Sequence, residues 1–377
     1  MSLYSMAVRL FLMTSLLISP AYADSEEAQI TKALNLYIEG TSYSHPEQIA
    51  QAFYSKANLL LTKEEQAVWS VPVDKYIDWF RKRPEGTPTG RQGEIISIDV
   101  NGDIATAKVE IVMPNKKDYY LDLFLLRKID NAWKIISKTA SKAADTRTGN
   151  KILFIVSSAH FHGDSDLPTG VSYSEIVKAY HTFTQAGYYV DFVSPEGGAI
   201  PLSYVNTADE LTKQYLYDSD LMYAIAHTKS PEQIKPEQYK AVHYVGGGNA
   251  MYGVAQDKGI QAIAMEIYEE HNGIISSVCH GTAGIAFLKL KSGEFLVQDK
   301  RISGYPDVYE NTSKAYFKEF PFHITKTIEA HGGTFLYSPR NSPHVEVDGR
   351  IVTGQNHLSS TGVAEKIIEL IESGSAG

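Results

Sequence analysis

The segment around residue 279 restricts the fold of this chain more than any other feature. Residues 274–278 are small or apolar and indicate a buried strand, while residues 280–284 begin a helix directly after it. A strand that turns this sharply into a helix passes close to itself, so small residues are needed two positions before and two after the turn. Ser277 and Gly281 meet that need, and Cys279 occupies the turn itself.

Cys279 is the single cysteine among 377 residues. A thiol at a helix N-terminus lies near the positive end of the helix dipole and near unpaired N–H groups, and both favour the thiolate. A lone cysteine is more often a small buried apolar residue. The turn and the neighbouring His280 nevertheless favour a reactive residue. We therefore predict a nucleophile with a lowered pKa that oxidises readily to sulfinic acid.

The first 23 residues have the organisation of a secretory signal peptide. Arg9 is their only charge, an apolar run follows at residues 10–18, and Ala21-Tyr22-Ala23 precedes Asp24. The apolar run is short for a membrane span, so we predict cleavage after Ala23 and no membrane insertion afterwards. No cysteine follows the cleavage site that could carry a lipid anchor. The protein is expected to be exported, either periplasmic or secreted.

Charge and cysteine content limit the partners and the sources of stability. Removing Arg9 with the signal peptide changes the formal net charge from −9 to −10. This acidity argues against nucleic acid or an anionic membrane as a partner. One cysteine cannot form an internal disulfide, so the stability of an exported chain must come from large apolar cores.

The length suggests two domains, and the sequence changes character near residues 139–150, where small and polar residues show no apolar periodicity. We predict a first domain over residues 24–141, a linker over 142–149 and a second domain over 150–377. In the first, helical spacing at residues 28–43, after Pro46 and at 73–83 is followed by strands at 93–100, 103–112, 119–129 and through Trp133. Helices followed by long alternating strands predict an α+β cone.

Residues 24–141 resemble the SnoaL-like and ketosteroid-isomerase-like superfamily, also called nuclear-transport-factor-like. Residues 120–136 carry most of this resemblance. It implies a cone that in some members holds a small apolar ligand and an acidic base. Asp74, Asp78 and Asp122 are candidates for that base by residue type only. Packing in a core or at a dimer face is the favoured role of the aromatic residues Trp69, Phe80 and Tyr119, which leaves a homodimer open.

After the linker, strands and helices alternate, which predicts a parallel sheet with helices on both faces. Strands are expected at residues 151–158, 188–194, 241–245 and 274–278, and helices at 172–187, 209–217, 260–271 and 361–373, with a hairpin at 345–353. Ligands bind such sheets beyond the carboxyl ends of the strands. Cys279, the three glycines at 246–248 and the loop after Ser158 all fall at that edge.

Four motifs in this second domain carry a closer resemblance. They are Thr-Gly-Val-Ser-Tyr-Ser-Glu at 169–175, Val-Cys-His-Gly at 278–281, Gly-Tyr-Pro-Asp-Val-Tyr-Glu at 304–310, and the stretch from Pro343 to Asn356. Their order across residues 150–373 is similar to the ThiJ/PfpI superfamily, a branch of the class I glutamine amidotransferase-like fold, and specifically to its heat-shock-protein and glyoxalase III group. The resemblance implies a flavodoxin-like α/β sandwich with a nucleophile elbow.

The resemblance also implies a role for each motif residue. Cys279 matches the nucleophile, Glu175 the acid that hydrogen-bonds the thiol, His280 the histidine after the nucleophile, and Glu310 the acid that orients this histidine. A carboxyl group kept protonated by burial beside Cys279 would move a proton during the reaction. The backbone N–H groups of His280 and of Gly247 or Gly248 would receive an oxyanion.

The chain also departs from the group. Gly246-Gly247-Gly248-Asn249 stands where Gly-Gly-His-Gly is usual, Gly253 replaces a common acid, and His357 replaces a proline. No metal is expected: His160 and His162 with Asp164 and Asp166 are too weak a pattern and favour a wet loop at the pocket rim. His344-Val345-Glu346 mimics the His-x-Glu pair of glutaminases but falls in the hairpin strand.

We therefore expect an enzyme of the glyoxalase III type that needs no cofactor. It would convert methylglyoxal or a related 2-oxoaldehyde to a 2-hydroxy acid, as a lyase of the D-lactate dehydratase type, with a small aldehyde as its partner. Two alternatives stay open because fold and nucleophile are shared among them. One is a stress-protective holdase or redox-sensing binding protein without catalysis, and the other is a ThiJ/PfpI-type hydrolase or peptidase.

Overall fold

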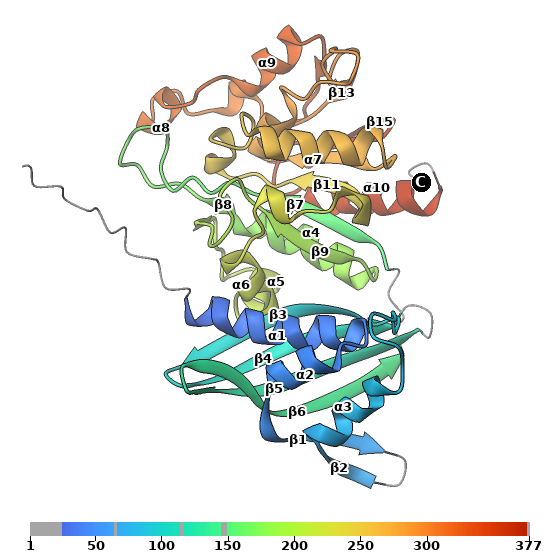
Figure 1. Ribbon diagram of the computed structural model, residues 1–377. Helices are drawn as coiled ribbons and strands as arrows, with labels where there is room; N and C mark the ends of the chain where they lie inside the picture. Colours follow the sequence, from blue (N-terminus) through green and yellow to red (C-terminus); the bar gives the residue numbers. More distant parts are fainter. Residues whose placement is uncertain (1–24, 64–65, 114–116, 145–148, 375–377) are drawn as a thin grey trace, which may run out of the picture. The chain divides into compact units, whose positions relative to one another are not determined.

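The computed structural model describes residues 25–63, 66–113, 117–144 and 149–374 (Figure 1). The predicted signal peptide lies outside these residues. None of the helices in the described ranges is long and apolar enough to cross a membrane. The chain forms two large sheets, each with its own helices, and each is described here by itself.

The first part of the chain combines three helices with a six-stranded sheet. The sheet has the strand order β2-β1-β6-β5-β4-β3. Its elements are α1 (Glu26–Ser42), α2 (Pro46–Ala52), β1 (Phe53–Lys63), β2 (Gln66–Pro72), α3 (Val73–Arg81), β3 (Gln92–Asn101), β4 (Ile104–Met113), β5 (Asp118–Ile129) and β6 (Ala132–Ala144). The α+β prediction is confirmed. The β1–β2 hairpin is not among the elements expected from the sequence, and β6 reaches Ala144, inside the segment 142–149 that is predicted as a linker.

Helix α1 packs on this sheet through one apolar face. Ile30, Leu34 and Tyr37 recur at helical spacing and are fully buried. The Tyr37 ring meets the Phe124 ring of β5 edge-on, with 5.0 Å between centroids. Together these contacts fix α1 against the sheet.

The acidic candidates of the first domain differ in burial. Asp122 of β5 is only 1% exposed, and its carboxylate lies 3.9 Å from the Arg91 guanidinium. Asp74 is exposed, and Asp78 pairs with Arg81 on the surface of α3. Of the three carboxylates that residue type alone suggested, only Asp122 is inside the domain.

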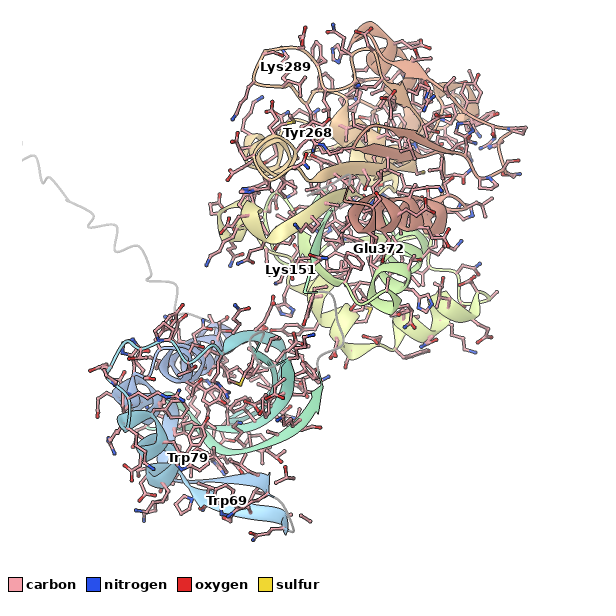
Figure 2. The ribbon with its side chains drawn as sticks, turned by 90° about the vertical axis from the view of Figure 1, so that its right-hand side faces the viewer. Trp69, Trp79, Lys151, Tyr268, Lys289 and Glu372 are labelled. Carbon is pink, nitrogen blue, oxygen red and sulfur yellow. The ribbon has the colours of Figure 1, made fainter. Side chains whose placement is uncertain are left out.

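Two tryptophans of the first domain lie side by side (Figure 2). Trp69 of β2 and Trp79 of α3 stack with 5.6 Å between ring centroids, and both rings keep partial contact with solvent. Phe80 is buried in the core. The stacked pair therefore joins the β1–β2 hairpin to α3 at the domain surface.

The second sheet has the order β15-β16-β12-β11-β7-β9, and all its strand pairs are parallel except β15–β16. Its strands are β7 (Lys151–Ile155), β9 (Tyr189–Val193), β11 (Tyr239–Tyr244), β12 (Ile274–Val278), β15 (Val345–Asp348) and β16 (Ile351–Gly354). The α-helices are α4 (Tyr173–Gln185), α5 (Glu210–Leu216), α6 (Ser219–Ala226), α7 (Lys258–Glu269), α8 (Ala315–Lys318), α9 (Ile324–Ala330) and α10 (Ser360–Glu372). Two-stranded pairs join β8 (Val171–Ser172) to β10 (Leu202–Ser203) and β13 (Arg301–Ile302) to β14 (Thr334–Phe335). The predicted flavodoxin-like sandwich is confirmed.

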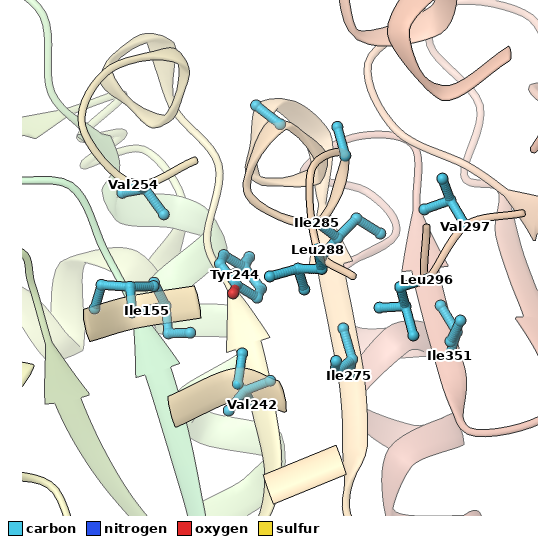
Figure 3. Close-up of a cluster of buried hydrophobic side chains, with 14 of the residues drawn as sticks. Ile155, Val242, Tyr244, Val254, Ile275, Ile285, Leu288, Leu296, Val297 and Ile351 are labelled. Carbon is cyan, nitrogen blue, oxygen red and sulfur yellow. The ribbon is translucent and has the colours of Figure 1, made fainter. Parts of the chain in front are cut away.

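Alternate residues of the strands face two separate apolar cores. Leu153 and Ile155 of β7 face the layer that contains α7 and α9, and Figure 3 shows part of this core around Tyr244. Ile152 and Phe154 face the layer of α4 and α10. A strand that is buried on both faces needs a continuous apolar run, which is why these strands lack the polar alternation of a half-exposed sheet.

Candidate active site

Strand β12 ends in a strained turn that carries the cysteine. Cys279 has φ +57°, a left-handed conformation that is unfavourable for a residue other than glycine. A Cβ on Gly281 would collide with the Tyr244 carbonyl group, so the turn requires glycine there. Ser277 is held by Thr282, with 2.8 Å between hydroxyl oxygens. The turn leads into the expected helix, which is a 3-10 helix, η5 (Cys279–Ile285).

The four predicted catalytic side chains lie together at the carboxyl edge of the sheet. Cys279 Sγ is 3.5 Å from His280 Nδ1, and His280 Nε2 is 2.7 Å from Glu310 Oε1. Glu175, in the first turn of α4, reaches the same thiol with its side chain. All four line one pocket. The structure therefore brings the Glu, Cys, His and Glu residues into one hydrogen-bonded chain.

The His280 ring is fixed on several sides. Its face stacks on Tyr305 with 4.7 Å between centroids, and the Phe320 ring meets it at a steeper angle. Glu310 follows η6 (Asp307–Tyr309) and is nearly buried. A buried carboxylate that accepts from Nε2 leaves Nδ1 directed at the sulfur, so the ring can exchange a proton with the thiol.

Burial controls the pKa values of the thiol and its carboxyl neighbour. Burial raises the pKa of Glu175 to about 7, although hydrogen bonds from Cys279 and from the Gly246 N–H partly oppose the rise. Burial also raises the pKa of Cys279 well above its usual value, the charge of Glu175 adds to the rise, and the His280 backbone N–H lowers it. The prediction of a lowered thiol pKa from the helix position is therefore wrong, because loss of solvation outweighs the short 3-10 turn.

A pH dependence of stability follows from Glu175. The unfolded carboxyl group ionises near pH 4.5, whereas the folded group keeps its proton until about pH 7. The folded state therefore binds more protons between these values, so the free energy of unfolding falls as pH rises through this range and levels off above it. The loss should be on the order of 2–3 kcal/mol. Urea unfolding of the wild type and Glu175→Gln at pH 5 and 8 measures it, and an equal loss in both proteins would contradict this assignment.

Gly246 separates the two reactive side chains. A Cβ at this position would lie 2.5 Å from Glu175 Oε2 and 2.8 Å from Cys279 Cβ. Gly246→Ala should therefore force Glu175 and Cys279 apart and destabilise the fold by about 3 kcal/mol or more. Gly362→Ala is the matched control, because its Cβ would meet only Val345 at an ordinary 3.4 Å. Thermal unfolding of both variants checks this prediction. Equal stability of Gly246→Ala and Gly362→Ala would contradict it.

The predicted oxyanion donors lie beside the thiol. Gly247 and Gly248 line the pocket together with Cys279. Gly247 has φ +113°, and a Cβ there would collide with the Gly170 carbonyl group, so glycine is required. Gly248 begins a 3-10 helix, η4 (Gly248–Met251), whose first N–H groups have no partner within the helix. The His280 N–H already donates to the sulfur of Cys279.

His162 was predicted in a wet loop and is instead buried in the pocket wall. Its ring stacks on Tyr316 with 5.2 Å between centroids, and Nδ1 lies 3.2 Å from the Tyr252 hydroxyl. A Cβ on Gly248 would lie 2.9 Å from His162 Cε1. The ThiJ/PfpI group usually has a histidine at the position of Gly248. In this chain the imidazole of His162, which comes from a different loop, fills the space beside that position.

Two other sequence patterns form no part of this hydrogen-bonded chain. In the described ranges of the chain, no group of three or more His, Cys, Asp or Glu side chains is arranged to hold a metal ion. His344 bonds Ser338 Oγ at 2.8 Å and Glu346 Oε1 at 2.9 Å, and Arg301 lies 3.3 Å from the other oxygen of Glu346. This network holds the hairpin and does not line the pocket around Cys279.

The pocket around Cys279 has a volume of about 840 Å³. Several of its residues were not identified from the sequence: Lys178, Tyr204, Asn206, Asp209, Tyr316 and Arg340. The predicted helix at residues 172–187 contains both Lys178 and Glu175, and this shared helix could have identified Lys178 as a pocket residue. Tyr204 and Arg340 come from loops whose paths no pattern in the sequence predicts.

The second part of the chain is similar to several known proteins. Glutathione-independent glyoxalase hsp3101 of Schizosaccharomyces pombe is 27% identical over 238 residues, which cover 59% of this chain and 96% of that protein. Glyoxalase 3 of Candida albicans is also 27% identical and covered to 98%. The crystal structure of glyoxalase III from Candida albicans superposes with a TM-score of 0.54 at 26% identity, over 59% of this chain and 97% of that one. Rapid Encystment Protein 24 KDa of Francisella tularensis gives 0.55 at 25% identity, over 58% and 98%.

Family comparisons cover both parts of the chain. Residues 25–141 match the family described as "Putative lumazine-binding", which agrees with the SnoaL-like, nuclear-transport-factor-like resemblance and with the α+β architecture. Residues 167–370 match the DJ-1/PfpI family, and they contain all four residues of the hydrogen-bonded chain. Since this match extends over more than half of the sequence, the chain belongs to the DJ-1/PfpI family.

Proposed function

We propose that the protein is a glutathione-independent glyoxalase that uses Cys279 as its nucleophile and no cofactor. Its substrate would be a 2-oxoaldehyde such as methylglyoxal, and its product a 2-hydroxy acid. The observation that carries the proposal is the chain of Glu175, Cys279, His280 and Glu310 in one pocket. The names of the glyoxalase relatives support the same reaction class.

In the first step, the sulfur of Cys279 adds to the aldehyde carbon, C1, and gives a thiohemiacetal. The raised pKa of the thiol means that its proton must leave during the attack. Glu175 and His280 Nδ1 are both in reach of this proton. The N–H groups of Gly247 and Gly248 would stabilise the oxygen as it gains negative charge.

In the second step, Glu175 takes the hydrogen of C1 as a proton and returns it to C2. The C1 hydroxyl loses its proton as C1 becomes the carbonyl carbon of a thioester, and the C2 oxygen gains one as it becomes a hydroxyl. Water then hydrolyses the thioester and frees Cys279. C1 is oxidised and C2 is reduced within one molecule, so no external oxidant or reductant is consumed. A carboxyl pKa near the working pH suits a group that both takes and gives a proton.

Kinetics without glutathione test the proposal. The purified protein should consume methylglyoxal in many turnovers per site and form lactate, with a rate that saturates with substrate and does not rise when glutathione is added. Consumption limited to one equivalent per protein would indicate adduct formation only. Suppression of client aggregation without turnover would favour the holdase alternative.

The described residues of the proposed site all come from the second part of the chain, between His162 and His357. We therefore expect a fragment from Asn150 onward to fold and to retain turnover per site, with the first domain in an accessory role. Steady-state kinetics and light scattering on this fragment check the expectation. A folded fragment with an intact Cys279 and no activity would show that the first domain completes the site. Export of the protein remains part of this proposal and is tested by locating the protein in cell fractions.

A further inference from the structure

The pocket extends well beyond the reactive chain. Its volume of about 840 Å³ lies within the range of roughly 300–1,000 Å³ that is typical for drug-sized ligands. A three-carbon aldehyde bound at Cys279 would leave most of this volume to water. We call the remaining space the outer pocket, which is lined by Ser174, Lys178, Asn206, Asp209 and Asn341.

The outer pocket is built from hydrogen-bonding side chains. It presents a hydroxyl group, two amides, an amine and a carboxylate, each on a different residue. The Asp209 carboxylate accepts from the Thr212 N–H at the start of α5, and the charge of Lys178 also stabilises it. Arg340 also lines the pocket and donates to the Tyr305 hydroxyl. A lining with both donors and acceptors suits hydroxyl groups better than an apolar chain.

The direction of a bound carbon chain follows from helix α4. Glu175 and Ser174 lie in its first turn, and Lys178 follows Ser174 by four residues, so Ser174 and Lys178 share one face. One helical turn rises about 5.4 Å. A substrate with C1 at Cys279 would therefore extend along α4, and its third and later carbons would pass Ser174 and Lys178.

Aromatic rings flank the pocket. Tyr204, Tyr305 and Tyr316 all line it, and rings of this kind pack against the C–H faces of polyhydroxylated chains. Tyr204 is 66% exposed and has φ +56°, a conformation that is costly for a bulky side chain. Strain of this kind persists where the surrounding structure holds it, and it concentrates at ligand sites.

We propose that the preferred substrates are polyhydroxylated 2-oxoaldehydes of five or six carbons, the dicarbonyl derivatives of sugars. The proposal rests on the function proposed above. The aldehyde carbon becomes the carboxylate and C2 becomes a hydroxyl carbon, one water is added, and no further reactant is needed. The hydroxyl groups from C3 onward bind in the outer pocket.

Substrate comparison and one variant test this proposal. kcat/KM for 3-deoxyglucosone and glucosone should exceed that for methylglyoxal by about tenfold or more. Lys178→Met should lower kcat/KM for the six-carbon substrates by about tenfold more than for methylglyoxal. Lys366→Met on α10 is the matched control, because Lys366 is solvent-exposed and pairs with Glu369. Equal kcat/KM values for all three substrates would overturn the proposal, as would a preference for a phosphorylated dicarbonyl.

A binding measurement separates failure of this proposal from failure of the proposed reaction. Calorimetric titration of the wild-type protein with D-gluconate and D-lactate compares a six-carbon with a three-carbon 2-hydroxy acid and requires no turnover. Gluconate should bind at least about tenfold more tightly, and Lys178→Met should reduce the difference. Tight gluconate binding without any turnover would retain the sugar-derived ligand and reject the reaction. Equal binding of gluconate and lactate together with methylglyoxal turnover would retain the proposed reaction and reject the sugar-derived ligand.

Discussion

Cys279→Ser should lower kcat for methylglyoxal by at least about a thousandfold while leaving the fold intact. Serine matches cysteine in size, so the strained turn at φ +57° keeps its packing. A hydroxyl group is far less acidic than a thiol, however, and its oxygen is a weaker nucleophile toward C1. The measurement is single-turnover kinetics beside circular dichroism and thermal unfolding of both proteins.

A residual activity above one tenth of the wild-type rate in a folded Cys279→Ser protein would contradict a nucleophilic cysteine. Loss of activity together with loss of the folded state would leave the cause unresolved, and Cys279→Ala then serves as a second variant. Its smaller side chain removes the sulfur without adding a polar group to the buried site.

Glu175→Gln and Glu310→Gln should differ in severity. Glu175→Gln should reduce turnover by roughly a thousandfold, because an amide cannot carry the proton from C1 to C2. Glu310→Gln should reduce it by roughly tenfold to a thousandfold, because His280 loses the carboxylate that orients its ring. Glu237→Gln, on the exposed surface, should have no effect. Equal and negligible effects of the first two changes would remove both residues from the mechanism.

The pH profile gives an independent measurement of the same pair. Glu175 and Cys279 share a buried site, so they lose their protons as a coupled pair. The active form is the pair that has lost one proton, whichever of the two residues holds the other. Because the pKa of Glu175 is raised to about 7, kcat/KM of the wild type should rise with pH through that region. A profile that is flat from pH 6 to 8 would contradict the assignment.

The clustering of the proposed catalytic residues could be predicted from the sequence because each falls in a local pattern with a defined place in the fold. Strand β12 is a short apolar run, and Ser277 and Gly281 mark its turn, so the position of Cys279 followed from local sterics. Parallel strands end at one edge, which brought the three glycines near Cys279. Helix α6 (Ser219–Ala226) was missed although Asp218 caps it through two backbone N–H groups, a signal that the sequence contains.

The properties that depend on burial could not be predicted in the same way. The pKa of Cys279 depends on solvent exclusion by several distant segments, and local position at a helix start indicated the opposite direction. The burial of His162 depends on Tyr252 and Tyr316, which lie 90 and 154 positions further along the chain.

Carbon NMR with methylglyoxal labelled at the aldehyde carbon tests the central claim most directly. The protein is dialysed free of glutathione and other small-molecule thiols and mixed with a large molar excess of the labelled substrate. The account predicts that the label moves into the carboxylate carbon of lactate over many turnovers, because C1 is the carbon that Cys279 attacks and that becomes oxidised. A label that stays in the hydrated aldehyde, or that appears only in a stoichiometric adduct with the protein, would contradict it.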